Sequence, residues 1–220
     1  MTGVLRAAIN LGNRALVQQD GDALTGVSPA LARRWAEANG LSFEPVIYHG
    51  AGKVFEDAGR DVWDVAFMAV DPLRAEHVTF SRPYHIIEAT YGVRAGSSIR
   101  APSDADRAGV TVVAAKGSAY ELVLRRDLTH ATLEHAATPG DSFEAFKAGR
   151  GDVVAGVRAS LERFFGDDGD VTILGGVLAT VEQAMVLPGK DHPGGAALDA
   201  FVAEAVETGF VARALRPPET

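Results

Sequence analysis

Polar side chains inside apolar segments, or at their ends, are the first candidates for chemistry in this sequence. Asn10 and Asn13 follow the apolar segment 4–9, and open α/β sheets bind ligands beyond the carboxyl ends of their strands. Glu88 and Gln183 each lie in an otherwise apolar run, where a buried carboxylate or amide needs a hydrogen-bonding partner. All four could contact a ligand. The alternative for Glu88 and Gln183 is a structural hydrogen bond between two chain crossings.

Residue patterns that carry metal binding or catalysis are missing from the sequence. There is no cysteine, so neither disulfides nor thiolate chemistry can be proposed. The six histidines are scattered without a spacing such as H-x-x-x-H, and no nucleophile–base–orienter triad or phosphate loop is visible. Tyr84, Tyr91 and Tyr120 could stack on a ligand, although core packing is the commoner use of tyrosine. We expect no cofactor and no metal.

The composition is that of a globular protein and limits its partners. Of the 220 residues, 47% are hydrophobic and 23% charged, near the usual values. A formal net charge of −8 disfavours nucleic acid, and no apolar run approaches the roughly 18 residues of a membrane span. No signal peptide is predicted. The expected location is the periplasm if a leader has been removed, and the cytoplasm if the chain is complete.

The elements that must position these residues follow the same order in both halves of the chain. The first half predicts strands at 4–9, 43–48 and 62–70, a short helix at 54–57, and a helix with Ser28 as N-cap and Pro29 at its first position. The second half predicts strands at 110–115, 132–135 and 153–157, a helix at 142–147, and a helix that begins with a capping box from Ser118 to Glu121. Ala-Gly-Arg precedes an apolar strand in both halves, at 58–60 and 148–150. We therefore predict two similar α/β lobes.

Two apolar runs connect these lobes. Residues 86–94 carry the chain out of the first lobe and residues 181–187 carry it back, with crossings near 89–93 and 182–186. We place lobe 1 at 1–91 plus 184–220 and lobe 2 at 92–183, and expect a separate sheet in each. The last helix, around 198–206, should pack on lobe 1. Two crossings form a hinge, and a hinge between α/β lobes makes a ligand cleft.

The order of motifs along the chain resembles the bacterial extracellular solute-binding proteins of family 3, the amino-acid-type receptors of ABC importers. The motifs are Leu24-Thr25-Gly26, Trp63-Asp64-Val65-Ala66, Arg74 with Phe80-Ser81-Arg82-Pro83-Tyr84 after it, Lys116-Gly117-Ser118 and Gly151-Asp152-Val153. The arginine-to-FSxPY motif is the most specific of them. The resemblance covers about residues 4–215 and implies a two-lobed periplasmic-binding-protein-like fold of type II.

The resemblance also implies roles for two residues. Arg74 matches the family arginine that clamps the ligand carboxylate, which a guanidinium can meet with two parallel hydrogen bonds. The alternative is a surface arginine paired with Glu76 or Asp71. Ser118 matches a second ligand contact at a helix N-terminus, where exposed N–H groups and the helix dipole favour anions. The alternative is a serine that only caps its helix.

The sequence departs from the family pattern where the ligand should be recognised. Met68 and Ala69 stand where the family has hydroxyl donors. The aspartate that takes the ligand ammonium in amino-acid receptors is absent from the strand end, which is Val157-Arg158. Because an unpaired buried ammonium is costly, we expect recognition through anionic or neutral polar groups. Arg158 could bind a second anionic group, or it could point to solvent from the next helix.

We therefore expect a monomeric binding protein that closes around a small carboxylate-bearing molecule, as the substrate-binding component of an ABC-type importer with a permease as partner. The resembled family also includes cyclohexadienyl dehydratase, in which a cleft carboxylate acts as an acid. Glu88 or Glu182 could take that role if burial raised its pKa. A ligand-sensing module is a third alternative.

Overall fold

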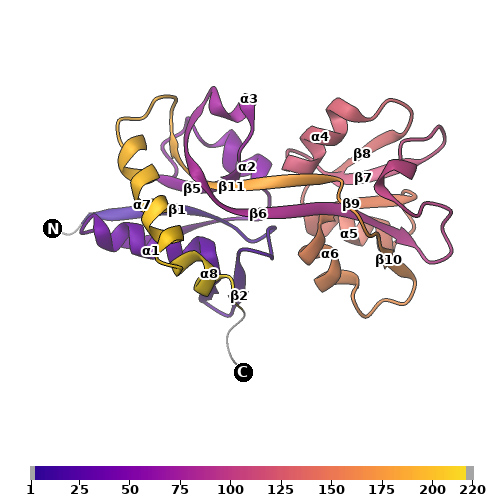
Figure 1. Cartoon of the computed structure of the whole chain (residues 1–220), viewed down its shortest axis with the longest axis horizontal. Helices are drawn as coiled ribbons and strands as arrows, with labels where there is room; N and C mark the ends of the chain where they lie inside the picture. The colour runs from indigo at the N-terminus through magenta and orange to yellow at the C-terminus, as the bar shows by residue number, and fades with distance from the viewer. Residues whose placement is uncertain (1–2, 217–220) are drawn as a thin grey trace. The chain divides into compact units, whose positions relative to one another are not determined.

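The computed structural model describes residues 3–216 of the chain, which divides into two compact units (Figure 1). Unit 1 comprises Met1–Ile86 and Glu182–Thr220, and unit 2 comprises Ile87–Val181. Both divisions lie a few residues before the boundaries that we placed at 91/92 and 183/184.

Unit 1 is built on three parallel strands. The central β1 (Val4–Asn10) lies between β4 (Ser42–Tyr48) and β5 (Val65–Ala69). Next to β5 comes the antiparallel β11 (Ala179–Pro188), and then β6 (Val78–Arg94). The hairpin β2–β3 and five helices complete the unit: β2 (Gln18–Asp20), β3 (Ala23–Thr25), α1 (Val27–Ala38), α2 (Ala51–Glu56), α3 (Pro72–Ala75), α7 (Gly195–Glu207) and α8 (Phe210–Ala214).

The C-terminal helices pack on the first helix of the chain, as expected from the sequence. The rings of Trp35 on α1 and Phe201 on α7 are 4.9 Å apart, and Arg34 forms a 2.8 Å ion pair with Glu204. On the same helix Arg34 also stacks over the ring of Phe210 of α8. Residues from the two ends of the sequence therefore complete one unit.

Helix α1 begins differently from our prediction. Its N-cap is Gly26, and Ser28 lies inside the helix, buried, with its hydroxyl 3.5 Å from that of Tyr84. Gly26 has a φ of 100°, and a Cβ there would lie 2.4 Å from the carbonyl oxygen of Leu16. Only glycine fits this close approach, so the backbone contact with Leu16, and not a serine cap, decides where the helix starts.

Unit 2 also has a parallel core. Strand β7 (Thr111–Ala115) lies between β8 (Thr132–Ala136) and β9 (Val153–Val157), all parallel. β9 pairs antiparallel with the second part of β6, where Ala89 is opposite Val157, and β10 (Val171–Ile173) pairs with β6 as well. The helices are α4 (Ala119–Asp127), α5 (Pro139–Lys147), α6 (Arg158–Phe165) and the short 3-10 turn η1 (Pro102–Asp104).

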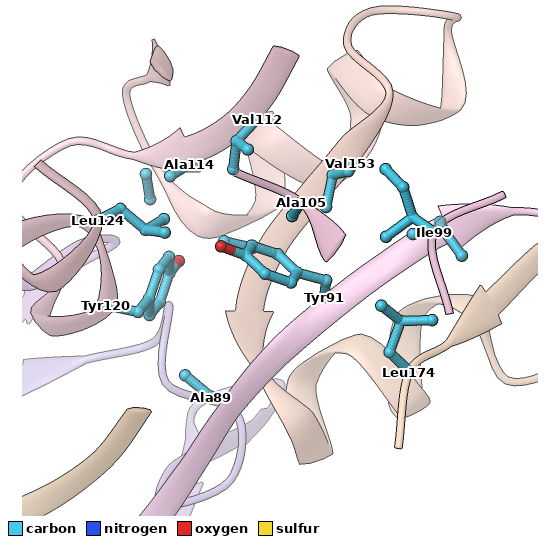
Figure 2. Packing of buried hydrophobic residues seen from close by; sticks show 13 residues of the cluster. Ala89, Tyr91, Ile99, Ala105, Val112, Ala114, Tyr120, Leu124, Val153 and Leu174 are labelled. Atoms are coloured by element: carbon cyan, nitrogen blue, oxygen red, sulfur yellow. The ribbon is translucent and has the colours of Figure 1, made fainter. Parts of the chain in front are cut away.

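A continuous apolar core fills one face of the unit 2 sheet. Figure 2 shows Tyr91 in the middle of this cluster, near Val112 and Val153, and Tyr120 beside Leu124 at one side of it. Both tyrosines are at most 4% exposed. They are core residues of unit 2.

Two strands run from one unit into the other. β6 and β11 both extend across the divisions at 86/87 and 181/182, so the two predicted crossings exist. The expectation of a separate sheet in each unit is wrong, because β6 is 17 residues long and contributes to the strand pairing of both units.

Candidate functional site

The carboxyl-terminal edge of the parallel strands in unit 1 carries most of the predicted site residues. β1 ends at Asn10 and β5 ends at Ala69, and the pairing of Ala8 with Ala66 places these two ends at the same edge. Helix α3 follows directly. Asp71 is its N-cap, accepting hydrogen bonds from the backbone of Leu73 at 2.9 Å and Arg74 at 3.1 Å. This cap fixes the backbone that bears Arg74.

Arg74 is a buried residue and not a surface arginine. It is 2% exposed, its Nη1 donates to the carbonyl oxygen of Ala69 at 3.2 Å, and its guanidinium lies 5.9 Å from the centre of the Phe55 ring. The alternative prediction was that Arg74 lies on the surface and pairs with Glu76 or Asp71. Glu76 instead forms a 2.7 Å ion pair with Lys190. The guanidinium therefore lies at the end of β5, turned into the protein.

Gln183 lies beside this arginine contact. In the β5–β11 pairing Gln183 is directly opposite Ala69, the residue whose carbonyl accepts from Arg74, and Gln183 is 4% exposed. Met68 faces the other way: it is 1% exposed and packs with Trp63 in the core of unit 1. Arg74, Ala69 and Gln183 thus come together, whereas Met68 occupies the position of a packing residue.

The loop after β1 contains a polar atom without a partner. Asn10 uses its Oδ1 to accept from the backbone of Gly12 at 3.0 Å. Asn13 accepts through its backbone oxygen from Leu16 and Val17, but its side-chain Oδ1 is buried and has no hydrogen bond. A buried carbonyl oxygen without a donor costs free energy. Of the two asparagines, Asn13 is thus the one with a buried side-chain oxygen that no donor of the protein satisfies.

In unit 2 the corresponding strand edge bears capped helices. Ser118 caps α4, accepting from Glu121 N at 3.2 Å, and the Glu121 carboxylate accepts from the Gly117 N–H at 3.0 Å. The serine cap is confirmed, but the reciprocal half of the predicted capping box is not, because the Ser118 N–H donates to the Ala115 carbonyl at 3.2 Å and Glu121 accepts from Gly117 instead. A hydroxyl has two lone pairs and one hydrogen, so capping leaves Ser118 able to make a second hydrogen bond. Whether it contacts a ligand stays a prediction.

The Glu121 carboxylate has partners that the sequence did not indicate. It is 1% exposed and lies 2.9 Å from Nε2 of His135 on β8 and 3.5 Å from Nε of Arg125. The Arg125 contact has the helical i,i+4 spacing and could have been read from the sequence. The His135 contact depends on the pairing of β8 with β7, which local spacing does not predict.

Tyr120 is a core residue with an unusual hydroxyl. Burial raises the pKa of this phenol to about 12, against the smaller opposite effects of Ser118 and the Ala115 backbone. The hydroxyl makes no hydrogen bond of ordinary geometry and points toward Tyr91 in Figure 2. The Tyr120 ring cannot stack on a ligand, because core side chains enclose it.

Arg158 makes structural contacts in unit 2. Its Nε lies 3.2 Å from the Glu88 carboxylate, and its Nη1 and Nη2 donate to the carbonyl oxygens of Leu174, at 3.0 Å, and Gly176. The side chain neither points to solvent nor offers a nitrogen without an acceptor. Glu88 is 49% exposed at its side chain, so it is a partly exposed ion-pair partner and not a buried carboxylate.

Among residues 3–216, no three histidine or acidic side chains gather as metal ligands would. Over the same range, no helix combines the length and apolar character needed to cross a membrane.

The comparisons with known proteins agree with this architecture. The structure of a putative binding component of an ABC transporter from Wolinella succinogenes DSM 1740, complexed with lysine, is 20% identical with a TM-score of 0.83, covering 97% of this chain and 94% of that one. The cysteine-binding protein from Campylobacter jejuni is 19% identical with a TM-score of 0.84, covering 96% and 87%. An ancestral amino acid-binding protein, a precursor of cyclohexadienyl dehydratase, is 17% identical with a TM-score of 0.80, covering 96% and 93%. These likenesses confirm the predicted type II periplasmic-binding-protein-like fold.

No curated protein matches the sequence. The family of bacterial extracellular solute-binding proteins, family 3, matches residues 7–214, nearly the whole chain. The resemblance carried by Arg74 and the Phe80–Tyr84 motif is thereby confirmed, and this chain belongs to the bacterial extracellular solute-binding proteins of family 3.

Proposed function

We propose that this protein binds a small carboxylate-bearing solute, that Arg74 donates hydrogen bonds to the carboxylate, and that the complex delivers the solute to an ABC-type permease. The observation that carries the proposal is the position of Arg74. It is a buried guanidinium at the carboxyl end of β5, the edge at which open α/β sheets bind ligands. The planar guanidinium of arginine can donate two parallel hydrogen bonds to a carboxylate, which the ammonium group of a lysine cannot.

The surrounding side chains suggest which solutes are preferred. Ala69 and Gln183 next to Arg74 carry no charge. In unit 2 the end of β9 is Val157, whose side chain packs against the apolar core, and the nearby Glu88 is paired with Arg158. Each of these positions lacks a carboxylate that is available to a ligand ammonium. We therefore propose that carboxylic acids bind more tightly than ordinary α-amino acids, although the relatives named above include proteins that bind lysine and cysteine.

A dehydratase-like activity is less well supported. This alternative needs a buried carboxyl group with a raised pKa, for which the sequence offered Glu88 and Glu182. Glu182 is exposed and Glu88 is half exposed beside a guanidinium, so neither has the apolar surroundings of a carboxyl that acts as an acid. The ancestral relative named above is itself an amino acid-binding protein.

A thermal-shift screen over mono- and dicarboxylic acids and the twenty standard amino acids tests the proposal. A ligand at a hundred times its Kd stabilises the folded state by about 2.7 kcal/mol, so binders should raise the melting temperature measurably. We expect the largest shifts from carboxylic acids. A larger shift from an ordinary amino acid would contradict the proposed preference, but not the binding function.

The Arg74→Ala variant tests the clamp. Its affinity for the best acid should fall by about 2–5 kcal/mol, because a desolvated charge pair is broken. The control is Arg60→Ala, an exposed arginine in the same unit, which should bind like the parent. Unchanged binding by Arg74→Ala, measured by calorimetry, would show that Arg74 has no part in the site.

A further inference from the structure

Arg158 lies at a junction of three chain segments within unit 2. It is the first residue of α6 and directly follows β9. All three guanidinium nitrogens have acceptors: the Glu88 carboxylate on β6 and the carbonyl oxygens of Leu174 and Gly176. With 26% of its side chain exposed, it is partly shielded from water. A planar guanidinium binds such acceptors in fixed directions.

The acceptors of Arg158 lie at the unit 2 ends of the two crossing strands. Glu88 is next to the division at 86/87 on β6, and Leu174 and Gly176 belong to the connection from β10 into β11. The two segments are also joined directly: Leu178 N donates to Ala89 O at 2.8 Å, and the buried Thr90 hydroxyl donates to Leu174 O at 3.1 Å. Arg158 thus connects the end of β9 to both crossings.

The connection into β11 needs such a contact because it contains two consecutive glycines. Gly175 has open space around it, and Gly176 adopts a φ of 80°. Glycine loses more conformational freedom on ordering than other residues. Leu174 and Gly176 lie on either side of Gly175, and the carbonyl oxygen of each accepts a hydrogen bond from the Arg158 guanidinium.

We propose that Arg158 is a positioning residue that fixes the unit 2 ends of both crossing segments and so restricts hinge bending to the residues between those ends and unit 1. Hinge motions are absorbed by a few residues at element ends. Without Arg158, residues 174–178 would share in the bending. The consequence for solute binding rests on the proposed function, but the positioning role itself does not.

Exchange of the two hydrogen-bonded amides of this segment, Leu174 and Leu178, in the dialysed protein without added solute tests the positioning role. Arg158→Met removes all three polar contacts but keeps an apolar side chain, and we expect exchange of these two amides to rise about tenfold, the loss expected for hydrogen bonds of a charged donor. Arg158→Lys should give a smaller rise. The control is Arg163→Met, an exposed arginine on the same helix, which should exchange like the parent.

A second measurement reports on the hinge. Because the sequence has no cysteine, Glu37→Cys and Glu144→Cys place one spin label on each unit, and both positions are exposed. The distribution of label distances should be broader in Arg158→Met than in the parent or in Arg163→Met. An unchanged distribution, or unchanged local exchange with only a lower melting temperature, would overturn the proposal and leave Arg158 a merely stabilising residue. Neither measurement uses a solute, so a failure of the carboxylate screen would leave both results readable.

Discussion

At the scale of single residues, the two arginines that the sequence offered as candidates for binding anionic groups of a ligand have different surroundings. Arg74 is buried at a strand end beside the carbonyl of Ala69, and Arg158 donates to a carboxylate and two carbonyls within unit 2. The residue type was the same in both cases. They differ in their acceptors: the Ala69 carbonyl lies five residues before Arg74, whereas the Glu88 carboxylate lies seventy residues before Arg158.

The geometry of the Arg74 fork can be separated from its charge. Arg74→Lys keeps a cation but loses the two parallel donors, so we expect it to recover only part of the affinity lost in Arg74→Ala. Calorimetric titration of the three proteins with the acid that gives the largest thermal shift measures this. If lysine restored the full affinity, a point charge alone would suffice and the bidentate interpretation would be wrong.

Gly26 offers a test of local backbone strain. Gly26→Ala introduces a Cβ that would lie 2.4 Å from the Leu16 carbonyl in addition to a positive φ. Gly40→Ala adds a Cβ at a φ of 66° with nothing within 4 Å. Gly40→Ala should destabilise by about 1 kcal/mol, from φ alone, and Gly26→Ala by clearly more. Urea unfolding compares them, and equal losses would show that the backbone around Leu16 can relax.

At the scale of elements, two helices of unit 2 share a type of N-cap and allow a matched comparison. Ser118 caps α4, and Thr138 caps α5 by accepting from Asp141 N at 3.1 Å. Ser118→Ala and Thr138→Ala should each lower the free energy of unfolding by about 1 kcal/mol.

Only the Ser118 variant should also bind the acid more weakly, if this hydroxyl contacts the ligand as the family resemblance implies. Affinity corrected for the stability change decides the question. Equal binding by both variants would leave Ser118 with its capping role alone.

The turn before β8 depends on one ionised carboxylate. Hydrogen bonds from the backbone of Ala131 and His130 and from Thr129 hold the pKa of Asp106 well below its usual value. A lowered folded-state pKa adds stability that is present above the unfolded pKa and is lost as the pH falls through the folded one.

We therefore expect the melting temperature of the parent to exceed that of Asp106→Asn by a constant amount from pH 7 to about 5, and this margin to shrink as the pH falls toward about 2. Calorimetric scans across that range measure it. A margin that does not depend on pH would mean that the amide replaces the carboxylate as an acceptor at every pH.

Helices and strands could be predicted from the sequence where nearby residues determine them, and not where contacts with distant segments do. β9 and the serine cap of α4 follow from an apolar run and from a Ser–Glu spacing, and the structure has both where they were predicted. β6 begins at Val78, well before the predicted run at 86–94, and its early part contacts α7, which is distant in the sequence, through Arg82 and Asp199. At the candidate site, the motif identified Arg74, but the Ala69–Gln183 pairing depends on β11, more than a hundred positions away.

At the scale of the whole molecule, the two units differ in how they are connected. Unit 2 is one continuous segment, whereas unit 1 needs residues from both ends of the sequence. β11 pairs with β5 from Gln183 to Val186, and α7 packs on α1. The C-terminal segment thus supplies an interior strand and a covering helix to unit 1.

Truncation after Val181 should therefore unfold unit 1 selectively. We expect amides of β1 and β5 to lose protection from hydrogen exchange, because β5 loses its β11 partner and the core loses Val186. Amides of β7 and β9 should keep their protection. Loss of protection in both units would show that unit 2 cannot fold without a completed unit 1.

The same connectivity has a consequence for synthesis on the ribosome. Every residue of unit 2 has been made by the time Val181 is added, when unit 1 still lacks β11 and α7. Residues 1–86 therefore remain an incomplete unit, with the β11 side of β5 unpaired, while unit 2 is translated and can fold. Exposed strand edges and apolar surface promote aggregation in such intermediates. The nascent N-terminal segment is therefore the part of this chain on which we expect a chaperone to act.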